Sequence, residues 1–493
     1  MTSNRLLLST AAKTAVAFAL LYVPAAHAQA TPAADQASAS PADQPTSLGD
    51  IIVTAQKRAQ RLQDVPVSIT AITGRQVEAM QITDLRSIQS YVPNLAVLNS
   101  GVNPVVYIRG FGSGPNNVAF DQEVSVYSDG IYGGRGAQFS APFFDLERME
   151  VLRGPQGALF GRNTAAGAIS LISAKPTRTF EGYVTGGYNV SRQGFEGSAV
   201  VSGPLSETLA GRIAAKITHE DGYIRNLFDN QKDPQLRDEL VRATLLWTPA
   251  AGVDVTAKGE YGRHQLNGGV TVTGSLTEPT NFDEKGSYRY ISDNYAGSGI
   301  PEQSGITTYN GALTANVALG THTLTAIAGY SHFTTRRLSA YDERNPDGTI
   351  QPASGNAKFG NAFPENFTQW SGEVRLASPT NQFFEYVVGA YYDTSKYHLH
   401  QDSYYRQIGG TITGHQSTDF QQNGDSYSFY GQGTLHLGPQ FRLIGGLRYS
   451  HTGKTATFTS GTVSGTALNT IGPDVAGSLS EHYVDPSATL QFD

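Results

Sequence analysis

From residue 181 to the end of the chain, apolar and polar residues alternate with a period of two. In residues 209–218 the apolar side chains fall on every second position and the charged ones lie between them; the pattern returns at 253–261 and 429–437. Successive side chains of a β-strand point to opposite faces, so this region predicts strands with one apolar and one polar face. A membrane barrel and a β-sandwich would both show this pattern.

The lengths of the connections between these strands separate the two folds. The short connections lie at 205–207, 249–251, 320, 379–381 and 438–439. Those between them, apart from the first at 191–194, are long and lie at roughly 221–237, 263–304, 336–365, 396–424 and 453–479. Because long and short connections alternate, all the long loops lie at one rim, which is typical of outer-membrane barrels and has no reason to arise in a sandwich. The sequence therefore predicts a transmembrane antiparallel β-barrel from residue 181 to 493, with about twelve strands.

Composition agrees with a barrel and excludes several other classes. Charged residues make up 16% and hydrophobic residues 39% of the chain, which has 54 glycines and 25 tyrosines. This profile argues against a long helical bundle and against disorder driven by charge. The absence of cysteine excludes disulfides, iron–sulfur clusters and thiolate metal sites. The net charge of -7 gives no support to nucleic-acid binding.

The first 28 residues have the features of a secretory signal peptide. Arg5 and Lys13 supply positive charge, residues 15–23 form an apolar core, and Ala-His-Ala at 26–28 is a small-x-small cleavage site. After the first thirty residues, no apolar run approaches the ~18 residues that a membrane helix needs.

Residues 29–61 are predicted to be a disordered linker that ends in a short apolar island. Residues 29–48 are rich in Ala, Gln, Ser, Pro and Thr and show no periodicity. The island consists of Asp50, Ile51, Ile52, Val53, Thr54 and Ala55. These residues cannot bury themselves within a flexible arm, but they can pair as an added strand with the sheet edge of another protein. The alternative is that they form the first strand of the next domain.

Residues 62–176 are predicted to form an N-terminal α/β domain of ordinary size. The segment 65–73 is a strand candidate, a short helix follows from Gly74, and a second helix is expected with Thr83 as its N-cap. Further strand candidates lie at 105–109, 124–127, 149–152 and 168–173.

The size of this domain does not match a barrel of about twelve strands. Such a barrel closes at a backbone radius of about 12 Å, whereas a domain of about 115 residues has a radius of gyration near 13 Å. Twenty-two strands give roughly 22 Å, and barrels of that size carry a plugged lumen. We therefore expect about twelve of 22 strands to be present, and the chain to be a C-terminally truncated product or a fragment.

Four segments resemble the N-terminal half of TonB-dependent outer-membrane receptors, of the siderophore-receptor type. They read DIIVTAQKR, VVYIRGFG, VSVYSDGIYGGR and LERMEVLRGPQGALFGRNTAAGAISLIS. The resemblance implies that Asp50–Ala55 is the TonB box, residues 62–176 the plug domain, and 181–493 the N-terminal part of the barrel. Members import scarce nutrients, most often ferric siderophores, with energy passed from the inner membrane through TonB.

The same resemblance implies the partners and the location of the protein. The expected partners are TonB of the inner-membrane complex, outer-membrane lipid and a small iron chelate or other nutrient. No cofactor and no nucleic acid are expected, and the protein should be a monomer in the outer membrane of a Gram-negative cell.

Several plug residues are expected to shape the domain or to tie it to the barrel. They are Arg109, Gly110, Asp129, Gly130, Glu150, Arg153, Gly154, Gly157 and Gly161. The glycines permit turns with positive φ and close backbone packing. The charged residues, together with Arg162 and Glu147, can pair with barrel charges such as Arg212, Lys216, Lys258, Glu260 and Glu373. A phosphate-binding loop at 157–164 is the competing interpretation, but the Gly-Lys-Ser/Thr ending is missing.

Two plug loops, 110–122 and 132–143, are the candidate ligand contacts. Their candidate contact residues are Phe111, Asn116, Asn117, Arg135 and Gln138. Arg135 can pair with an anionic ferric chelate. His398, His400 and Asp402 share one side of an extended segment and could hold a metal, but scattered surface histidines are more common, so no metal site is predicted. No catalytic arrangement stands out, and the protein is predicted not to be an enzyme.

The leading functional hypothesis is therefore TonB-energised uptake of a scarce nutrient, with a ferric siderophore as the default substrate. An oligosaccharide, cobalamin or an aromatic compound is the alternative, since Tyr404, Tyr405 and Tyr427 suit sugar stacking equally well. A passive porin or a surface adhesin is a further alternative, against which the plug sequence argues.

Overall fold

The computed structural model describes residues 51–100, 103–114, 121–225, 232–268, 303–341, 357–407, 412–465 and 473–492. The predicted signal peptide, most of the predicted linker, and Asp50, Asn116 and Asn117 lie outside these residues. All the described residues belong to one compact unit.

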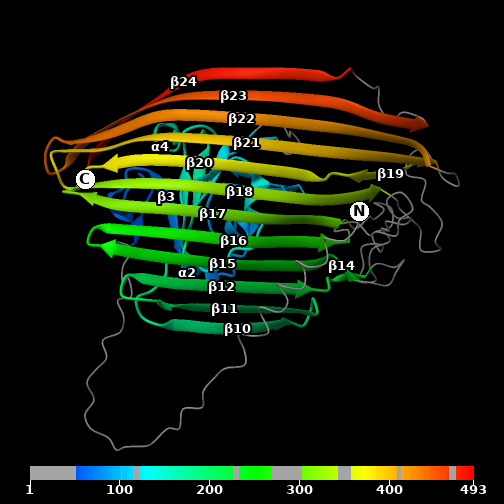
Figure 1. The fold of residues 1–493 in the computed structure, drawn as a ribbon, viewed down its shortest axis with the longest axis horizontal. Coiled ribbons are helices and arrows are strands. Elements are labelled where there is room, and N and C mark those ends of the chain that lie inside the picture. Colours follow the sequence, from blue (N-terminus) through cyan, green and yellow to red (C-terminus); the bar gives the residue numbers. More distant parts are fainter. Residues whose placement is uncertain are drawn as a thin grey trace, which may run out of the picture. The chain divides into compact units, whose positions relative to one another are not determined.

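A 13-stranded antiparallel sheet makes up most of this unit (Figure 1). Its strands are β10 (Glu181–Asn189), β11 (Gly194–Pro204), β12 (Leu209–Glu220), β15 (Gln235–Ala250), β16 (Val253–Asn267), β17 (Gln303–Leu319), β18 (His322–Tyr341), β19 (Ala357–Ala362), β20 (Glu365–Ala377), β21 (Phe384–Gln407), β22 (Ile412–His436), β23 (Phe441–Gly465) and β24 (Val475–Phe492). Strands β19 and β20 both lie between β18 and β21, so the described sheet has twelve strand positions, with β10 and β24 at its two edges. A separate two-stranded ribbon, β13 (Ile224–Arg225) and β14 (Lys232–Asp233), falls between β12 and β15 in the sequence.

The period-two pattern places apolar side chains on the outer face of this sheet and polar ones on its inner face. On β12, Ile213 is 58% exposed, whereas its neighbour Arg212 is 8% exposed. Leu245 and Trp247 of β15 are likewise exposed, while Thr244, which precedes Leu245, is buried. An apolar outer face and a polar inner face are what a strand needs between lipid and a lumen.

The strands at the long-loop rim are longer than the sequence pattern indicates. The prediction of a loop over 396–424 was wrong, because β21 runs to Gln407 and pairs with β22 from Phe384↔Leu435 to Tyr405↔Gly414. Residues 453–465 also belong to a strand, β23, and not to a loop. Strand pairing provides hydrogen-bond partners for the backbone N–H and C=O groups of these largely polar segments. Because they lack a regular apolar face, their sequence pattern does not identify them as strands.

The N-terminal α/β domain has a mixed five-stranded sheet in the order β3-β8-β9-β6-β7, in which β6 and β9 are parallel. Its elements are β3 (Ser68–Thr73), α2 (Gly74–Ala79), α3 (Leu85–Ile88), β4 (Leu95–Ser100), β5 (Asn103–Ile108), β6 (Val124–Ser128), β7 (Ile131–Gly133), β8 (Leu146–Arg153), α4 (Gly157–Phe160), β9 (Gly167–Ser173), and the 3-10 turns η2 (Leu62–Asp64) and η3 (Gly136–Phe139). Ile88, Ile108, Met149 and Ile169 are fully buried in its core.

One helix of this domain begins one residue later than the sequence pattern indicates. Asp84, not Thr83, is the N-cap of α3, and its carboxylate accepts a hydrogen bond from Ser87 N at 2.7 Å. Aspartate is the better cap because its carboxylate accepts strongly and suits the positive end of the helix.

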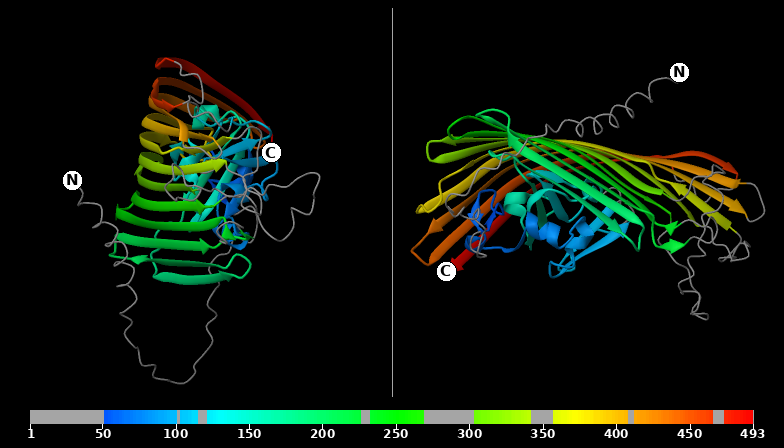
Figure 2. Two further views of the ribbon diagram at one scale, coloured as in Figure 1. Left: turned by 90° about the vertical axis from the view of Figure 1, so that its right-hand side faces the viewer. Right: turned by 90° about the horizontal axis from the view of Figure 1, so that it is seen from below.

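The α/β domain lies against the concave inner face of the curved sheet (Figure 2). In the described part of the chain, no helix is long and apolar enough to cross a bilayer.

Candidate functional site

The apolar island of the sequence is part of a small hairpin that is docked onto the α/β domain. Strands β1 (Ile52–Val53) and β2 (Gln60–Arg61) pair antiparallel, and the turn between them is closed by a hydrogen bond from Lys57 N to Thr54 O. Val53 and Ala55 are buried and pack in one apolar cluster with Leu152. The linker was expected to be disordered as far as residue 61; its described part, 51–61, is instead folded, because the α/β domain supplies the apolar cover that the arm lacks.

A buried carboxylate of the α/β domain holds the middle of this hairpin. Glu150 Oε1 accepts hydrogen bonds from Thr54 N at 2.9 Å and Thr54 Oγ1 at 3.1 Å. The same oxygen accepts from Arg148 Nε at 2.8 Å, and Glu150 is only 1% exposed. Glu150, which the sequence suggested as a contact between domain and barrel, therefore contacts the hairpin.

Two cations in the hairpin turn connect it to the large sheet. Lys57 Nζ lies 2.5 Å from Glu373 Oε2, and Arg58 Nη1 lies 2.7 Å from Glu385 Oε2, with all four side chains nearly buried. Glu385 is the second residue of β21, directly after the short connection 378–383. The hairpin therefore lies near the rim of the short connections, which is the periplasmic rim of an outer-membrane barrel.

Lys57 is held in a position that disfavours its charge. Burial lowers the pKa of its ammonium to about 8, although Glu373 opposes this effect. Glu373 has two further partners, since it accepts hydrogen bonds from Arg375 Nη1 at 2.8 Å and Tyr430 OH at 2.9 Å. Glu373 therefore remains paired when Lys57 leaves, which makes the contact between hairpin and sheet reversible at modest cost.

The Lys57→Met substitution is expected to tighten hairpin docking and remove its pH dependence. The pKa of Lys57 is about 8 when docked, against 10.5 ordinarily. The released hairpin binds more protons between these values, so docking in the native chain strengthens as the pH rises through 8 to 10.5. A spin label attached to Cys in an Ala59→Cys background would report docking, because the fraction of mobile label falls as the hairpin docks.

The matched control is Arg58→Met, which leaves Lys57 in place and should retain the response of the spin label to pH. A response that persists unchanged in Lys57→Met would contradict the assignment of the pH dependence to this ammonium.

Ion pairs continue from the hairpin across the whole interface between the α/β domain and the sheet. Asp145 receives two hydrogen bonds from Arg212, at 2.8 and 2.5 Å, and Asp129 pairs with Lys258. Arg162 pairs with Asp393 at 2.7 Å, and Asp121 with Lys454 at 3.1 Å. Although burial favours the neutral acid, Arg162 and Lys454 lower the pKa of Asp121 to about 2.

The sequence predicted some of these partners and missed others. Asp129 and Arg162 on one side, and Arg212, Lys258 and Glu373 on the other, do take part in the interface. It missed Lys57, Arg58, Asp121, Asp145 and Asp393. The only available signal was the pair of cations at 57 and 58, one residue after the end of the apolar island.

Other predicted residues lie away from these ion pairs. Arg109 and Gly110 are exposed at a turn with positive φ, where Arg109 N donates to Asn94 O. Arg153 is half-buried and makes no ion pair with the sheet among the described residues. Gly130 and Gly154 also have positive φ.

Helix α4 approaches the sheet closely at β22, β23 and β24. Gly161 has φ +85, and a Cβ on it would lie 2.6 Å from Arg448 Cζ; a Cβ on Gly157 would lie 3.2 Å from Asp485 Cγ. Arg448 Nη1 donates to Leu159 O at 3.2 Å. Gly161 is therefore favoured by its positive φ and by this close approach, whereas a Cβ on Gly157 would require a small shift of the Asp485 side chain.

The candidate ligand residues have different surroundings. Phe111 is 68% exposed. Arg135 lies over the ring of Tyr397, with its guanidinium carbon 3.7 Å from the centroid, and donates to Gln422 Oε1 at 2.9 Å. Gln138 is buried and donates to Ser331 Oγ at 3.0 Å. Arg135 and Gln138 thus contact the inner wall of the sheet, and a role in ligand binding stays a prediction for all three residues.

The histidines of the β21–β22 extension are paired with carboxylates. His398 Nε2 and His400 Nδ1 lie 2.9 and 3.0 Å from Asp419 Oδ1, and His400 Nε2 lies 3.2 Å from Asp402. Within the described ranges, no group of three or more such side chains is arranged to hold a metal ion.

Two family models match the chain. One, described as the TonB-dependent receptor plug domain, matches residues 61–168, and the other, described as a TonB-dependent receptor-like β-barrel, matches residues 242–493.

Named relatives include an iron-regulated outer membrane protein, a ferric enterobactin receptor and a vitamin B12 transporter. The iron-regulated outer membrane virulence protein of Vibrio cholerae is 30% identical over 35% of this chain and 28% of the relative. The ferric enterobactin receptor PirA of Pseudomonas aeruginosa is 24% identical over 83% of this chain and 57% of the relative. The vitamin B12 transporter BtuB of Photobacterium profundum is 27% identical over 38% of this chain and 30% of the relative. The matches span well under two thirds of these relatives.

The chain is also similar in fold to solved structures. The ferric yersiniabactin uptake receptor FyuA of Yersinia pestis superposes with a TM-score of 0.67 at 18% identity, covering 86% of this chain and 61% of that one.

Proposed function

The chain belongs to the TonB-dependent receptor family, and we propose that it serves as an outer-membrane receptor and transporter for TonB-energised uptake of a ferric siderophore. The family consists of transport receptors of the Gram-negative outer membrane and not of enzymes. The observation that carries the proposal is the hairpin 51–61, which is docked at the periplasmic rim by contacts that can break.

TonB is the proposed partner of residues 50–55. Only two residue pairs, Ile52↔Arg61 and Val53↔Gln60, hold β1 in its hairpin. Once released, β1 has free backbone groups that can add to the sheet edge of another protein, and the β-branched residues of the island favour a strand. Release exposes Val53, whose burial contributes about 2 kcal/mol, so TonB binding has to supply equivalent contacts.

A ferric siderophore is the proposed substrate because of the relatives. Three of the proteins named above are described as iron-regulated, as a ferric enterobactin receptor or as a ferric yersiniabactin uptake receptor. Cobalamin is the second candidate, since a vitamin B12 transporter is also among the relatives.

Uptake of labelled substrate by cells that produce the protein tests this function. Radiolabelled iron would be supplied as a catecholate, a hydroxamate and a citrate chelate, beside labelled cyanocobalamin. Accumulation of one iron chelate should fall at least tenfold in a host without TonB or with a protonophore, while binding at the cell surface remains. Growth promotion should appear in iron-limited and not in carbon-limited medium. Accumulation that continues without the proton gradient would instead indicate a passive porin, and binding without accumulation an adhesin.

A further inference from the structure

An alternating row of imidazole and carboxylate side chains lies on the extension of β21 and β22, which comprises residues 395–407 and 412–424. Each neighbouring pair in the row is joined by a contact of 2.9–3.2 Å between a ring nitrogen and a carboxylate oxygen. All five members come from these two strands. We call the row the His–Asp ladder; its members, in order, are His398, Asp419, His400, Asp402 and His415.

The ladder lies on the outer face of the sheet, in a part of the barrel that water reaches. Tyr397 and Leu399 face inward and are buried, so the even-numbered positions of β21 between and beside them face outward. A membrane-spanning strand needs about 9–11 residues, whereas His400 is the seventeenth residue of β21 counted from the short-connection rim. The side chain of His398 is 47% exposed, so protons from the medium have access to the ladder.

The central imidazole needs a second proton to make both of its contacts. His400 presents Nδ1 to Asp419 at 3.0 Å and Nε2 to Asp402 at 3.2 Å. A neutral imidazole has one donor and one acceptor nitrogen, and a carboxylate only accepts, so neutral His400 donates to only one of the two. The imidazolium donates to both. His398 and His415 each present Nε2 to one carboxylate of the ladder, a contact that a neutral ring also makes.

The ladder lies where the pairing of the extension with its neighbouring strands changes on both sides. On one side, β21 pairs with β20 as far as Leu399 and with β19 from Asp402 onward. On the other side, the pairing of β22 with β23 shifts register between Gln416 and Thr418. Irregularities of this kind disrupt the backbone ladder and bend the strand. Side-chain contacts between β21 and β22 therefore matter more here than in the regular part of the sheet.

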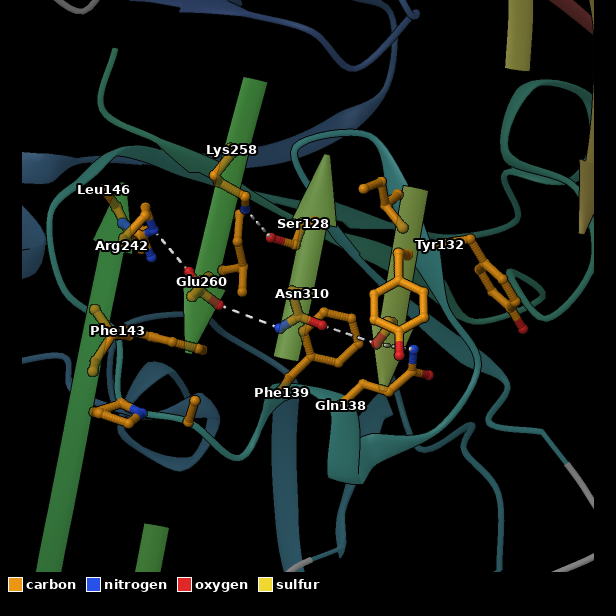
Figure 3. A pocket seen from close by; sticks show the side chains of 18 residues that line it. Ser128, Tyr132, Gln138, Phe139, Phe143, Leu146, Arg242, Lys258, Glu260 and Asn310 are labelled. Atoms are coloured by element: carbon orange, nitrogen blue, oxygen red, sulfur yellow. Dashed lines mark hydrogen bonds and ion pairs between the residues drawn. The ribbon is translucent and has the colours of Figure 1, made fainter. Parts of the chain in front are cut away.

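The inner face of the extension holds a candidate ligand residue of the plug. The guanidinium carbon of Arg135 lies 3.7 Å from the ring centroid of Tyr397, and Nη2 donates to Gln422 Oε1 at 2.9 Å. These two partners lie opposite each other on β21 and β22. The turn η3, which follows Arg135, is held separately on β18, where Gln138 donates to Ser331 Oγ at 3.0 Å (Figure 3). The extension can therefore move against Arg135 while η3 stays attached to the sheet.

We propose that the His–Asp ladder is a proton-dependent brace, which holds the extension against Arg135 while His400 is charged and loosens it when the proton leaves. The neutral ring keeps one carboxylate and turns a lone pair toward the other, so an attractive contact becomes a repulsive one. Single exposed ion pairs contribute little to stability, but several charges in a network contribute more. Binding is favoured when the binding surface is already ordered. Where it concerns the substrate, the inference rests on the proposed function.

The pH dependence of the brace follows from the two groups at its centre. The hydrogen bond to Asp419 raises the pKa of His400 above its ordinary 6.5; burial opposes this effect and Asp402 adds to it. Although burial favours the neutral acid, hydrogen bonds from His398 and His400 lower the pKa of Asp419 below its ordinary 3.8. The brace is therefore complete at mildly acidic pH, and it is lost as the pH rises through the raised pKa of His400.

Other charged groups lie near the ladder among the side chains that the structure describes. Lys396 lies on the same face of β21, and Glu365 of β20 lies on the inner face, where it accepts from Tyr397 OH at 3.1 Å. Lysine and glutamate side chains ordinarily titrate well outside the range from about pH 5.5 to about pH 8.5. A response within this range therefore reports the imidazoles.

A spin label at position 401 tests the brace, since the chain has no cysteine of its own. Gln401→Cys places the label between His400 and Asp402 in sequence, on the face opposite to the ladder. In detergent, the mobile fraction of the label should rise about threefold from about pH 5.5 to about pH 8.5. His400→Gln should give the high fraction at both pH values, because glutamine has donors at one end only. His400→Arg should keep the fraction low at both, because its guanidinium stays charged and donates from several nitrogens.

The matched control is His322→Gln, which removes a histidine of β18 at the opposite rim and should leave the native profile unchanged. The brace is overturned if the label in the native background does not respond to pH, or if His400→Gln keeps the native response. It is also overturned if His400→Arg fails to hold the label at the higher pH.

Surface binding of the labelled iron chelates tests the link to the substrate. Native protein and His400→Arg are compared at the same pH, so that a change in the charge of the chelate itself cancels. His400→Arg should bind about threefold more strongly at about pH 8.5, and the two proteins should bind equally at about pH 5.5. Equal binding at both pH values would overturn the link between the brace and the substrate. A native chain that binds none of the chelates would instead count against the proposed function, while the spin label would still decide whether the brace exists.

Discussion

Deletion of residues 50–55 is expected to abolish energised uptake, by a factor of 100 or more, while substrate binding at the cell surface remains. The proposed transport needs a segment that TonB can hold, and these residues include β1, which pairs with β2 through only two residue pairs. Ligand binding is predicted for the plug loops 110–122 and 132–143, which the deletion does not touch. Uptake and surface binding of the same labelled iron chelate, measured on the same cells, check the prediction.

The matched control removes six residues of the polar segment before the island, 40–45, which carry no apolar side chain suited to strand pairing beyond alanine. This control should transport as the native chain does. A finer variant, Val53→Pro, keeps the length and removes one backbone donor, so it should also prevent strand addition. Native uptake by the deletion variant would show that TonB acts elsewhere or that transport does not need it.

The barrel was predictable from the sequence because its signal is local. Alternation along residues such as 209–218 follows from lipid on one side and a polar lumen on the other, and each strand carries that pattern by itself. The extensions of β21 and β22 carry no such pattern, since polar residues predominate there and apolar ones such as Leu399 and Phe420 are few. Sequence reasoning therefore mistook 396–424 for a loop.

The interface between plug and barrel was much less predictable, because its partners are far apart in the sequence. Lys57 and Glu373 are separated by 316 positions, and Arg162 and Asp393 by 231. A charged residue in a strand shows that its side chain faces the lumen but not which plug residue lies opposite. The folding of residues 51–61 was missed for the same reason, since the apolar cover for Val53 comes from Leu152 in β8.

The Glu150→Ala substitution is expected to release the hairpin and to destabilise the plug by about 3 kcal/mol. Glu150 accepts from Thr54 and from Arg148 at one oxygen, within a site that is almost closed to water. Without the carboxylate, Arg148 is left in a buried position with the half-exposed Glu147 as its remaining ion-pair partner among the described residues. Removing one member of a buried ion pair costs about 3–5 kcal/mol, and Glu147 offsets part of this cost.

Trypsin provides the measurement, because Lys57, Arg58 and Arg61 are cleavage sites that lie within the docked hairpin. Cleavage of the Glu150→Ala protein in detergent should be faster than that of the native protein by at least tenfold, since a loss of 1.4 kcal/mol already changes an equilibrium tenfold. Glu147→Gln is the matched control: it removes the other partner of Arg148, but its side chain is 43% exposed and does not contact Thr54. Exposed pairs contribute less than about 1 kcal/mol, so this variant should be cut at nearly the native rate. Equal protection of the two variants would mean that burial of Val53 and Ala55, and not the Glu150 carboxylate, keeps the hairpin docked.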